Sequence, residues 1–267
     1  MPYPRRRYGF WKKTKMAILV SGVPLIRHWS DIWQKKDCLW VGFGIAIIWI
    51  QIKMHMEFLI EDASGGRMPE CLLPKILGEY GTTHTWRIHP YKGIGSLPKN
   101  LDYGNDPVKQ ALLNDLPRLP GGYARTPGID AVIVIMDVDS RECKNFLAEL
   151  KNLAAKKSPT LNVIFRLAIE EIEAWYLGDK NAVLRAYPNG KRPQKKLEKY
   201  QQDSICNTWE WLADVIYPGG ADKLKRERMA GKIKYEWAEK ITPFMEPTQN
   251  KSPSFQRFYK RLLEIDV

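Results

Sequence analysis

The chain has 267 residues, 44% of them hydrophobic and 27% charged, which fits a soluble globular protein of one large or two small domains. Its formal net charge of +12 favours an acidic partner such as nucleic acid. Its four cysteines form no Cys-x-x-Cys pair, which argues against a thiolate zinc site and fits reduced thiols in a cytoplasmic protein.

The first 55 residues differ in composition from the rest of the chain. They hold ten Lys or Arg and only two acids, so they carry +8 of the net charge, and they contain five of the ten Trp but no Glu. This segment lacks clear helix or strand periodicity, and Met54 and Met56 stand just before the first convincing strand. We therefore interpret residues 1–55 as a doubtful N-terminal extension, and we expect translation to start at Met54 or Met56.

A membrane anchor is the alternative interpretation of the extension. The apolar run 39–50 follows basic residues, but its 12 residues fall short of the roughly 20 that a spanning helix requires. Membrane association is therefore the less favoured interpretation.

From Met56 onward the chain alternates strand and helix patterns. Short apolar runs predict strands at 56–61, 84–91, 130–139 and 161–169. Amphipathic patterns predict helices at 67–80, 106–119, 141–157 and 170–179, with Gly- and Pro-rich loops at 92–100 and 121–128. The alternation predicts an α/β domain over residues 56–180, with a parallel sheet flanked by helices.

Strand patterns end near residue 180. Helical patterns follow at 191–202, 207–217, 233–241 and 254–265, separated by segments rich in Gly and Pro such as 217–223. We expect residues 181–267 to form a C-terminal helical subdomain that packs on the α/β domain.

Three of the predicted strands end in acidic residues, namely Glu61 and Asp62, Asp137 and Asp139, and Glu170, Glu171 and Glu173. Parallel α/β sheets bind ligands at the carboxyl ends of their strands, and clustered carboxylates repel one another unless a cation holds them. Because Mg²⁺ and Mn²⁺ prefer oxygen ligands, the pattern predicts a metal site made by Glu61, Asp137, Asp139, Glu171 and Glu173. Such an ion would serve chemistry at phosphorus.

Each acid also has a purely structural interpretation. Asp139 and Glu142 have the spacing of a capping box for the helix that follows them. The glutamates at 170–173 could favour a helix N-terminus through its dipole, and Glu61 could be an ordinary strand-end residue. The convergence of three acidic strand ends favours the metal site over these alternatives.

Three other features of the sequence bear on binding or catalysis. Lys92 stands beside Gly93 in a loop where a phosphate could be approached, so we take Lys92 together with Glu61 as candidate catalytic residues; a solvated Lys in a tight loop is the alternative. Trp175 is expected in the core rather than as a platform for a nucleobase. The basic segment 191–200 is expected to be a solvated helix face, with contact to a phosphate backbone as the alternative.

Five segments of the chain, in order, resemble a bacterial Toprim-like family of unknown function, which is related to the Toprim domains of topoisomerases, primases and overcoming-lysogenization-defect nucleases. They are FLIEDASGG, HTWRIHPYKGIG, VIVIMDVDS, IEEIEAWYLGD and SPSFQRFYKRL, and they span about residues 56–265. Glu at the end of a first strand, followed by Asp-x-Asp at the end of a later strand, carries the likeness.

The resemblance implies roles for these residues. Glu61 would be the Toprim glutamate, a general acid/base or metal ligand, and Asp137 and Asp139 would be the metal aspartates, with Glu171 or Glu173 completing the acidic edge. It implies a Mg²⁺-dependent nuclease with an ATPase partner and a role in phage defence. Many Toprim domains have Glu-Gly at the first motif, whereas here Asp62 follows Glu61. This departure from the motif affects the expectation of catalysis more than the expectation of the fold. The alternative is a non-catalytic Toprim-like module that binds an ATPase or nucleic acid.

Overall fold

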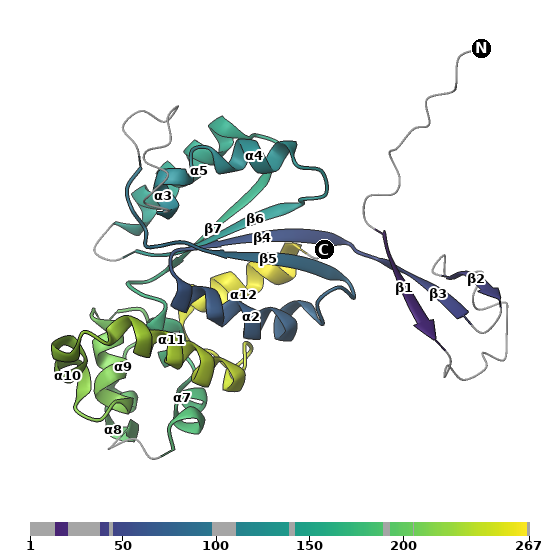
Figure 1. Ribbon diagram of the computed structural model, residues 1–267. Coiled ribbons are helices and arrows are strands. Elements are labelled where there is room, and N and C mark those ends of the chain that lie inside the picture. Colours follow the sequence, from purple (N-terminus) through teal and green to yellow (C-terminus); the bar gives the residue numbers. More distant parts are fainter. Residues whose placement is uncertain are drawn as a thin grey trace, which may run out of the picture.

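The computed structural model describes residues 14–20, 38–42, 45–97, 111–138, 142–188, 193–204 and 206–265, with side chains from residue 52 onward except 193 and 194. Its centre is a four-stranded sheet with helices on both faces (Figure 1). The strands are β4 (Met54–Ile60), β5 (His84–Pro90), β6 (Ala131–Asp137) and β7 (Asn162–Ala168). They are all parallel and lie in the order β5-β4-β6-β7, which confirms the predicted α/β fold.

The apolar runs of the central strands are explained by burial on both faces of the sheet. One face packs on α2 (Ala63–Leu77) and α12 (Pro253–Ile265), and the other is covered by α3 (Leu112–Asp115), α4 (Leu119–Arg125) and α5 (Cys143–Lys157) (Figure 1). Alternate residues of β4 enter the two cores, with Phe58 in the first and Leu59 in the second. Parallel sheets covered on both faces need such continuous apolar strands.

The C-terminal region is helical, as predicted. Its elements are α6 (Glu173–Leu177), α7 (Lys180–Ala186), α8 (Pro193–Lys199), α9 (Thr208–Ile216), α10 (Gly220–Glu227), α11 (Ala230–Ile241) and the short 3₁₀ helix η1 (Thr242–Phe244). Trp175 is fully buried, donates from Nε1 to Ser254 Oγ at 2.8 Å and stacks on Phe258, so its predicted place in the core is confirmed. One continuous apolar cluster joins these helices to the sheet face that carries Phe58.

Part of the segment 106–128 differs from the prediction. Residues 106–110 of the helix predicted at 106–119 lie outside the described residues; in the rest of that range the helix is α3, which ends before Pro117, because proline cannot continue the helical hydrogen-bond pattern. The loop predicted at 121–128 is wrong for residues 121–125, because α4 runs from Leu119 through the two glycines to Arg125, whereas residues 126–128 are not helical. Pro120 stands in the first turn of α4, where proline is tolerated, and Tyr123 packs against the second core. Tertiary packing therefore outweighs the low helix propensity of Gly-Gly here.

Within the extension, three strands form a separate antiparallel sheet in the order β1-β3-β2. They are β1 (Thr14–Val20), β2 (Cys38–Gly42) and β3 (Ile45–Gln51), and they lie beyond the amino end of β4 (Figure 1). The apolar run 39–50 falls on β2 and β3 rather than on a helix. Across the part of the chain that the structure describes, no helix is both long and apolar enough to span a bilayer.

Strand β4 begins at Met54, two residues before the strand predicted from the sequence. Met54 pairs with His84, and His55 is tied to its surroundings by three hydrogen bonds. Its backbone N–H donates to Asp130 at 2.8 Å, and its ring nitrogens lie 2.7 Å from Thr85 Oγ1 and 3.2 Å from Glu57 Oε1. The folded sheet therefore includes residues on the N-terminal side of Met56.

A chain shortened to begin at Met56 would lack the three hydrogen bonds of His55, whereas a chain that begins at Met54 keeps them. Each half-buried hydrogen bond contributes about 1 kcal/mol, so we expect the Met56 chain to be less stable by about 2–3 kcal/mol. Urea unfolding of the two chains measures the difference. Equal free energies of unfolding would show that His55 does not stabilise the sheet.

Candidate functional site

Two of the predicted acids, Glu61 and Asp137, meet where β4 and β6 end. The strands are neighbours in the sheet, and the backbone N–H of Asp137 donates to Glu61 Oε2 at 2.9 Å. The N–H of Glu61 donates in turn to the carbonyl of Ile135 at 3.2 Å, which continues the strand pairing one residue past β4. The sheet itself therefore fixes the two carboxylates at one edge.

The carboxyl group of Asp137 lies in an unfavourable electrostatic environment. The residue surface is partly exposed, but protein atoms displace water from its carboxyl group. This desolvation, together with repulsion from Glu61 and Glu173, raises the pKa of Asp137 well above its ordinary value, and Lys234 acts in the opposite direction. A carboxyl group whose pKa is strongly shifted by burial and by specific neighbouring charges is a candidate for a functional site.

Glu171 and Glu173 reach the same edge from the segment after β7, where they meet Lys234 of α11. The Lys234 Nζ lies 3.3 Å from Glu171 Oε1 and 3.4 Å from Glu173 Oε1. The other oxygen of Glu171 accepts from the hydroxyl of Thr208 at 3.0 Å and from the N–H of Trp209 at 2.9 Å. Two of the predicted acids, Glu171 and Glu173, are thus paired with one ammonium group.

Lys234 and Glu173 differ in how burial affects them. Burial works to lower the pKa of Lys234, but attraction by Glu173, Glu171 and Asp137 outweighs it, so the pKa of Lys234 is raised and the ammonium stays protonated. Glu173 is fully buried and neither of its oxygens accepts a hydrogen bond from the described residues. Burial raises the pKa of Glu173 to about 7 despite the attraction of Lys234, so this carboxyl holds a proton much more readily than an ordinary glutamate.

Sequence analysis did not find Lys234. It lies far from the acids along the chain, and a single lysine in an amphipathic helix is usually solvated. A signal was present, because Ala238 and Ile241, four and seven residues later, are fully buried on the same side of α11. A lysine on the apolar side of a helix needs a partner, and here the partners are the acids of the sheet edge.

Asp62 and Glu142 have local structural roles. Asp62 is the N-cap of α2, with Oδ1 accepting from the N–H of Gly65 at 2.6 Å. Glu142 is itself the N-cap of α5, because its carboxylate accepts from the backbone of Lys144 and Asn145. The capping box considered for Asp139, with Glu142 three residues inside the helix, is therefore not formed; Asp139 lies outside the described residues.

Lys92 is exposed in the loop after β5. The N–H of the next residue, Gly93, donates to the carbonyl of Glu61 at 2.8 Å, and Gly93 and Gly95 both have positive φ. A side chain at Gly95 would approach Asn114 Oδ1 within 2.7 Å, so the tight turn depends on glycine. The loop thus holds Lys92 close to the acidic edge of the sheet.

The donors for a metal ion are incomplete in the described part of the chain. No group of three or more His, Cys, Asp or Glu side chains there is arranged to hold a metal ion. Glu61 and Asp137 offer oxygen donors at one edge, whereas the nearby Glu171 and Glu173 pair with Lys234. The oxygen-only chemistry of Glu61 and Asp137 fits Mg²⁺ or Mn²⁺.

A second charged cluster, also missed in the sequence, lies on β4 and β5. Glu57 is only 2% exposed, and its carboxylate is 2.6 Å from His89 Nε2 and 3.2 Å from His55 Nε2, with Arg87 at 4.0 Å. Burial works to raise the pKa of Glu57, but the hydrogen bonds and charges of the two histidines lower it to about 2. Parallel pairing of β4 and β5 creates this cluster from residues 32 positions apart.

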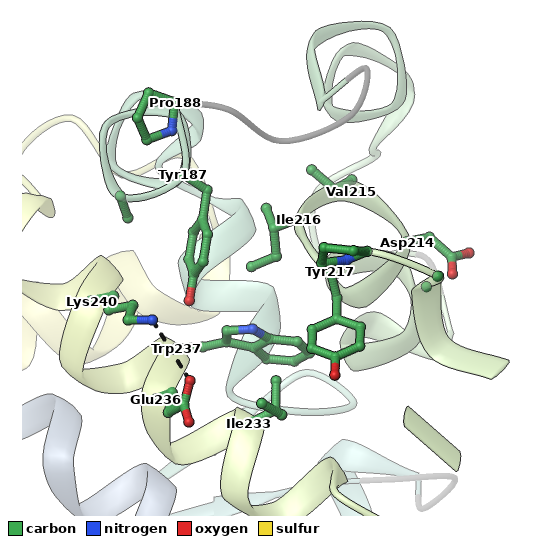
Figure 2. A pocket seen from close by; sticks show the side chains of 14 residues that line it. Tyr187, Pro188, Asp214, Val215, Ile216, Tyr217, Ile233, Glu236, Trp237 and Lys240 are labelled. Carbon is green, nitrogen blue, oxygen red and sulfur yellow. Dashed lines mark ion pairs between the residues drawn. The ribbon is translucent and has the colours of Figure 1, made fainter. Parts of the chain in front are cut away.

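A pocket of about 650 Å³ lies among α7, α9, α10 and α11 (Figure 2). Its lining includes the rings of Tyr187, Tyr217 and Trp237, and an ion pair between Glu236 and Lys240 lies beside it. Ile233 and Trp237 of α11 line this pocket, whereas the adjacent Lys234 contacts the acids. The pocket and the acidic edge are therefore on different sides of one helix.

Removing the buried ammonium should destabilise the protein. In Lys234→Met, the carboxylates lose their cation, and breaking a buried pair costs about 3–5 kcal/mol. The remaining acids then have raised pKa values in the folded state, so their contribution to stability falls as the pH rises above about 4.5. We expect urea unfolding to show a loss that is larger at pH 8 than at pH 5. Lys232→Met, on the exposed side of α11, is the control and should change stability little at either pH.

Glu57 should make the protein sensitive to acid. Its pKa is lowered in the folded state, so its contribution is present above about pH 4.5 and is lost as the pH falls toward 2. The difference in the pKa of Glu57 between the unfolded and the folded protein corresponds to up to about 3 kcal/mol of stability. Glu57→Gln should flatten the fall in free energy of unfolding between pH 6 and pH 3, and the exposed Glu149→Gln should not. An unchanged slope in Glu57→Gln would contradict the assignment.

Comparison with known proteins covers both the sheet and the C-terminal helices. A family model described as a domain of unknown function, DUF4276, matches residues 60–263, from the end of β4 to α12. No curated protein and no solved structure matches the chain. The matched range contains Glu61, Asp137, Glu171, Glu173 and Lys234, so the acidic edge lies within it. The chain therefore belongs to the DUF4276 family.

Proposed function

We propose that this protein is a metal-dependent enzyme that cleaves phosphodiesters of nucleic acid. One observation carries the proposal: adjacent strands hold Glu61 against Asp137, whose pKa is raised because burial and repulsion are not fully compensated. A bound divalent cation would relieve that repulsion. The resemblance to Toprim domains implies that Asp137 and Asp139 are the metal aspartates and that Glu61 is a general acid/base or a metal ligand.

Charge balance supports a divalent ion at this edge. Lys234 is protonated and offsets the charge of Glu171 and Glu173, and the raised pKa of Glu173 lowers the negative charge to be offset. A bound divalent ion would favour the deprotonated form of Asp137, and Glu61 and Asp137 would then offer it two negative charges. From the sequence, Asp139 is the third expected ligand, and in this proposal Glu171 and Glu173 support the site through Lys234 instead of binding the metal directly.

The residues of the chain divide the work around such an ion. Mg²⁺ or Mn²⁺ would supply charge neutralisation at phosphorus and orientation of a water molecule. The N–H of Asp137 keeps the Glu61 carboxylate oriented, and Lys92 brings an exposed cation for a phosphate oxygen. An ATPase partner and a role in phage defence are further parts of the proposal, and they rest on the resemblance alone.

A non-catalytic binding module is the second candidate function. It is favoured by Lys234, which already supplies a cation to the acids, and by the lack of a three-residue metal group among the described side chains. In that case the fold would bind an ATPase or nucleic acid, and the acids would serve the structure. Asp137→Ala and Glu61→Gln would then leave biological activity intact.

Cleavage assays test the proposal directly. With Mg²⁺ or Mn²⁺, and with an ATPase partner if one copurifies, we expect cleavage of DNA or RNA that falls about 100-fold or more in Asp137→Asn and in Glu61→Gln. Glu149→Gln, an exposed acid on α5, is the matched control and should keep full activity.

Calorimetric titration of Mn²⁺ and Mg²⁺ gives a readout that does not require turnover. Binding to the original chain that is lost in Asp137→Asn would place the metal at this edge. If the same variant binds metal and cleaves nucleic acid like the original chain, the proposal is wrong and the binding module is favoured.

A further inference from the structure

Positive charge beyond residue 55 is concentrated in one segment. Residues 185–244 hold thirteen Lys or Arg and eight Asp or Glu, a formal net charge of +5. Residues 56–184 and 245–267 together carry −1. Where the structure describes it, this segment comprises the end of α7, then α8 to α11 and η1, so the charged residues described there lie on the C-terminal helices and not on the sheet.

The same segment is rich in aromatic rings with a cation over them. Six such contacts lie in it, at 4.7–5.9 Å from the ring centroids: Arg185 over Phe244, Lys196 over Trp211, Lys223 over Tyr217, Lys225 and Lys234 over Trp209, and Lys240 over Tyr187. Folded proteins have roughly one significant contact of this kind per 70–80 residues. These partly exposed rings and the cations over them together form a cationic and aromatic surface.

Trp209 connects this surface to the acidic edge. Its backbone N–H donates to Glu171 at 2.9 Å, and its partly exposed ring has Lys225 at 5.4 Å and Lys234 at 5.9 Å. Lys234 is the lysine that pairs with the acids. A ligand that covers the Trp209 ring would therefore lie next to the proposed site of cleavage.

The pocket of Figure 2 lies among the same helices, on the other side of α11 from the acids, and Tyr217 at the end of α9 joins it to the side of Trp209. Tyr187 and Tyr217, each with a lysine over its ring, line it together with Trp237. Its volume of about 650 Å³ falls within the range of small-molecule sites, which is ample for one nucleobase. Aromatic walls with nearby ammonium groups fit a flat ring that carries a phosphate.

The lysines of this surface can exchange their present partners for phosphate. Lys225 is 54% exposed and pairs with Glu210 at 3.1 Å, and Lys240 is 56% exposed and pairs with Glu236 at 3.6 Å. Exposed pairs of this kind contribute little to stability, because water and salt compete for both ions. Long flexible side chains can therefore turn from the rings toward a bound backbone.

We infer that α8 to α11 form a binding surface for single-stranded nucleic acid, which leads the strand to the acidic edge. The lysines would contact phosphates and the rings would stack on unpaired bases, with Trp209 nearest the acids and the pocket holding one base. Duplex bases are stacked on each other and cannot use these rings. The inference names the substrate class of the proposed function and rests on it for the chemistry, but not for the binding.

Fluorescence anisotropy with a labelled 20-nucleotide single strand, and with the same sequence as a duplex, tests the binding. The full chain is used in EDTA, so that neither metal nor cleavage contributes. We expect Trp209→Leu and Tyr217→Leu each to weaken single-strand binding about 5- to 100-fold, the effect of losing one stacked base. Lys225→Gln should reduce the slope of log affinity against log salt by about 0.7.

Matched variants separate this surface from general charge effects. Residues 1–55 carry a net charge of +8 and can attract any nucleic acid. The test therefore rests on the differences in affinity between variants of the same full chain. Lys151→Gln on α5 and Tyr80→Leu, both exposed and outside the segment 185–244, should bind like the original chain. Thermal unfolding of each variant confirms that it is folded.

The inference is overturned if folded Trp209→Leu and Tyr217→Leu bind the single strand normally, or if the duplex binds as tightly and with the same losses. Weakened binding in these variants combined with no cleavage under any condition would leave the surface assigned and remove the proposed chemistry. Cleavage that depends on Asp137, with binding that is insensitive to Trp209 and Lys225, would remove the inference and keep the proposed function.

Discussion

The buried ammonium of Lys234 is the interaction on which the carboxyl edge of the sheet depends. Without it, Glu171, Glu173 and Asp137 would be acids placed in low dielectric with no compensating cation, at a cost of several kcal/mol. The ammonium also ties α11 to the segment after β7, so a helix from late in the chain becomes part of the edge formed by β4 and β6. Fold and electrostatics are therefore coupled at one place.

Most of the sheet could be predicted, because each strand has a local signal in its own residues. A short, continuous apolar run such as that of β6 is typical of a strand buried on both faces of a parallel sheet. The acids that follow such runs mark the edge of the sheet at which the strands end. The pairing of Glu61 with Asp137 follows from two such runs being neighbours. These features are encoded in short stretches of sequence, and the spacing of apolar residues can be recognised within such stretches.

The features that were missed depend on contacts between distant segments. Lys234 has no local pattern that separates it from a solvated lysine, and Glu57 becomes a buried ion only because β5 brings His89 beside it. The helix α4 forms against local propensity, since Tyr123 gains a packing partner that the sequence around it does not reveal. Trp209 was missed for the same reason, because its position beside the acids depends on a hydrogen bond to Glu171, which is distant in the sequence.

Helix α11 contacts both the acids at the edge of the sheet and the pocket among the C-terminal helices. Lys234 faces the acids, while Ile233 and Trp237 form part of the pocket wall. A helix is a stiff body, so a shift that repositions Trp237 also displaces the ammonium relative to Glu173. Because the attraction between buried charges changes steeply with distance, even a small displacement alters the charge of the acidic edge. Any ligand in the pocket that moved α11 would therefore also change the electrostatic potential at the ends of the strands.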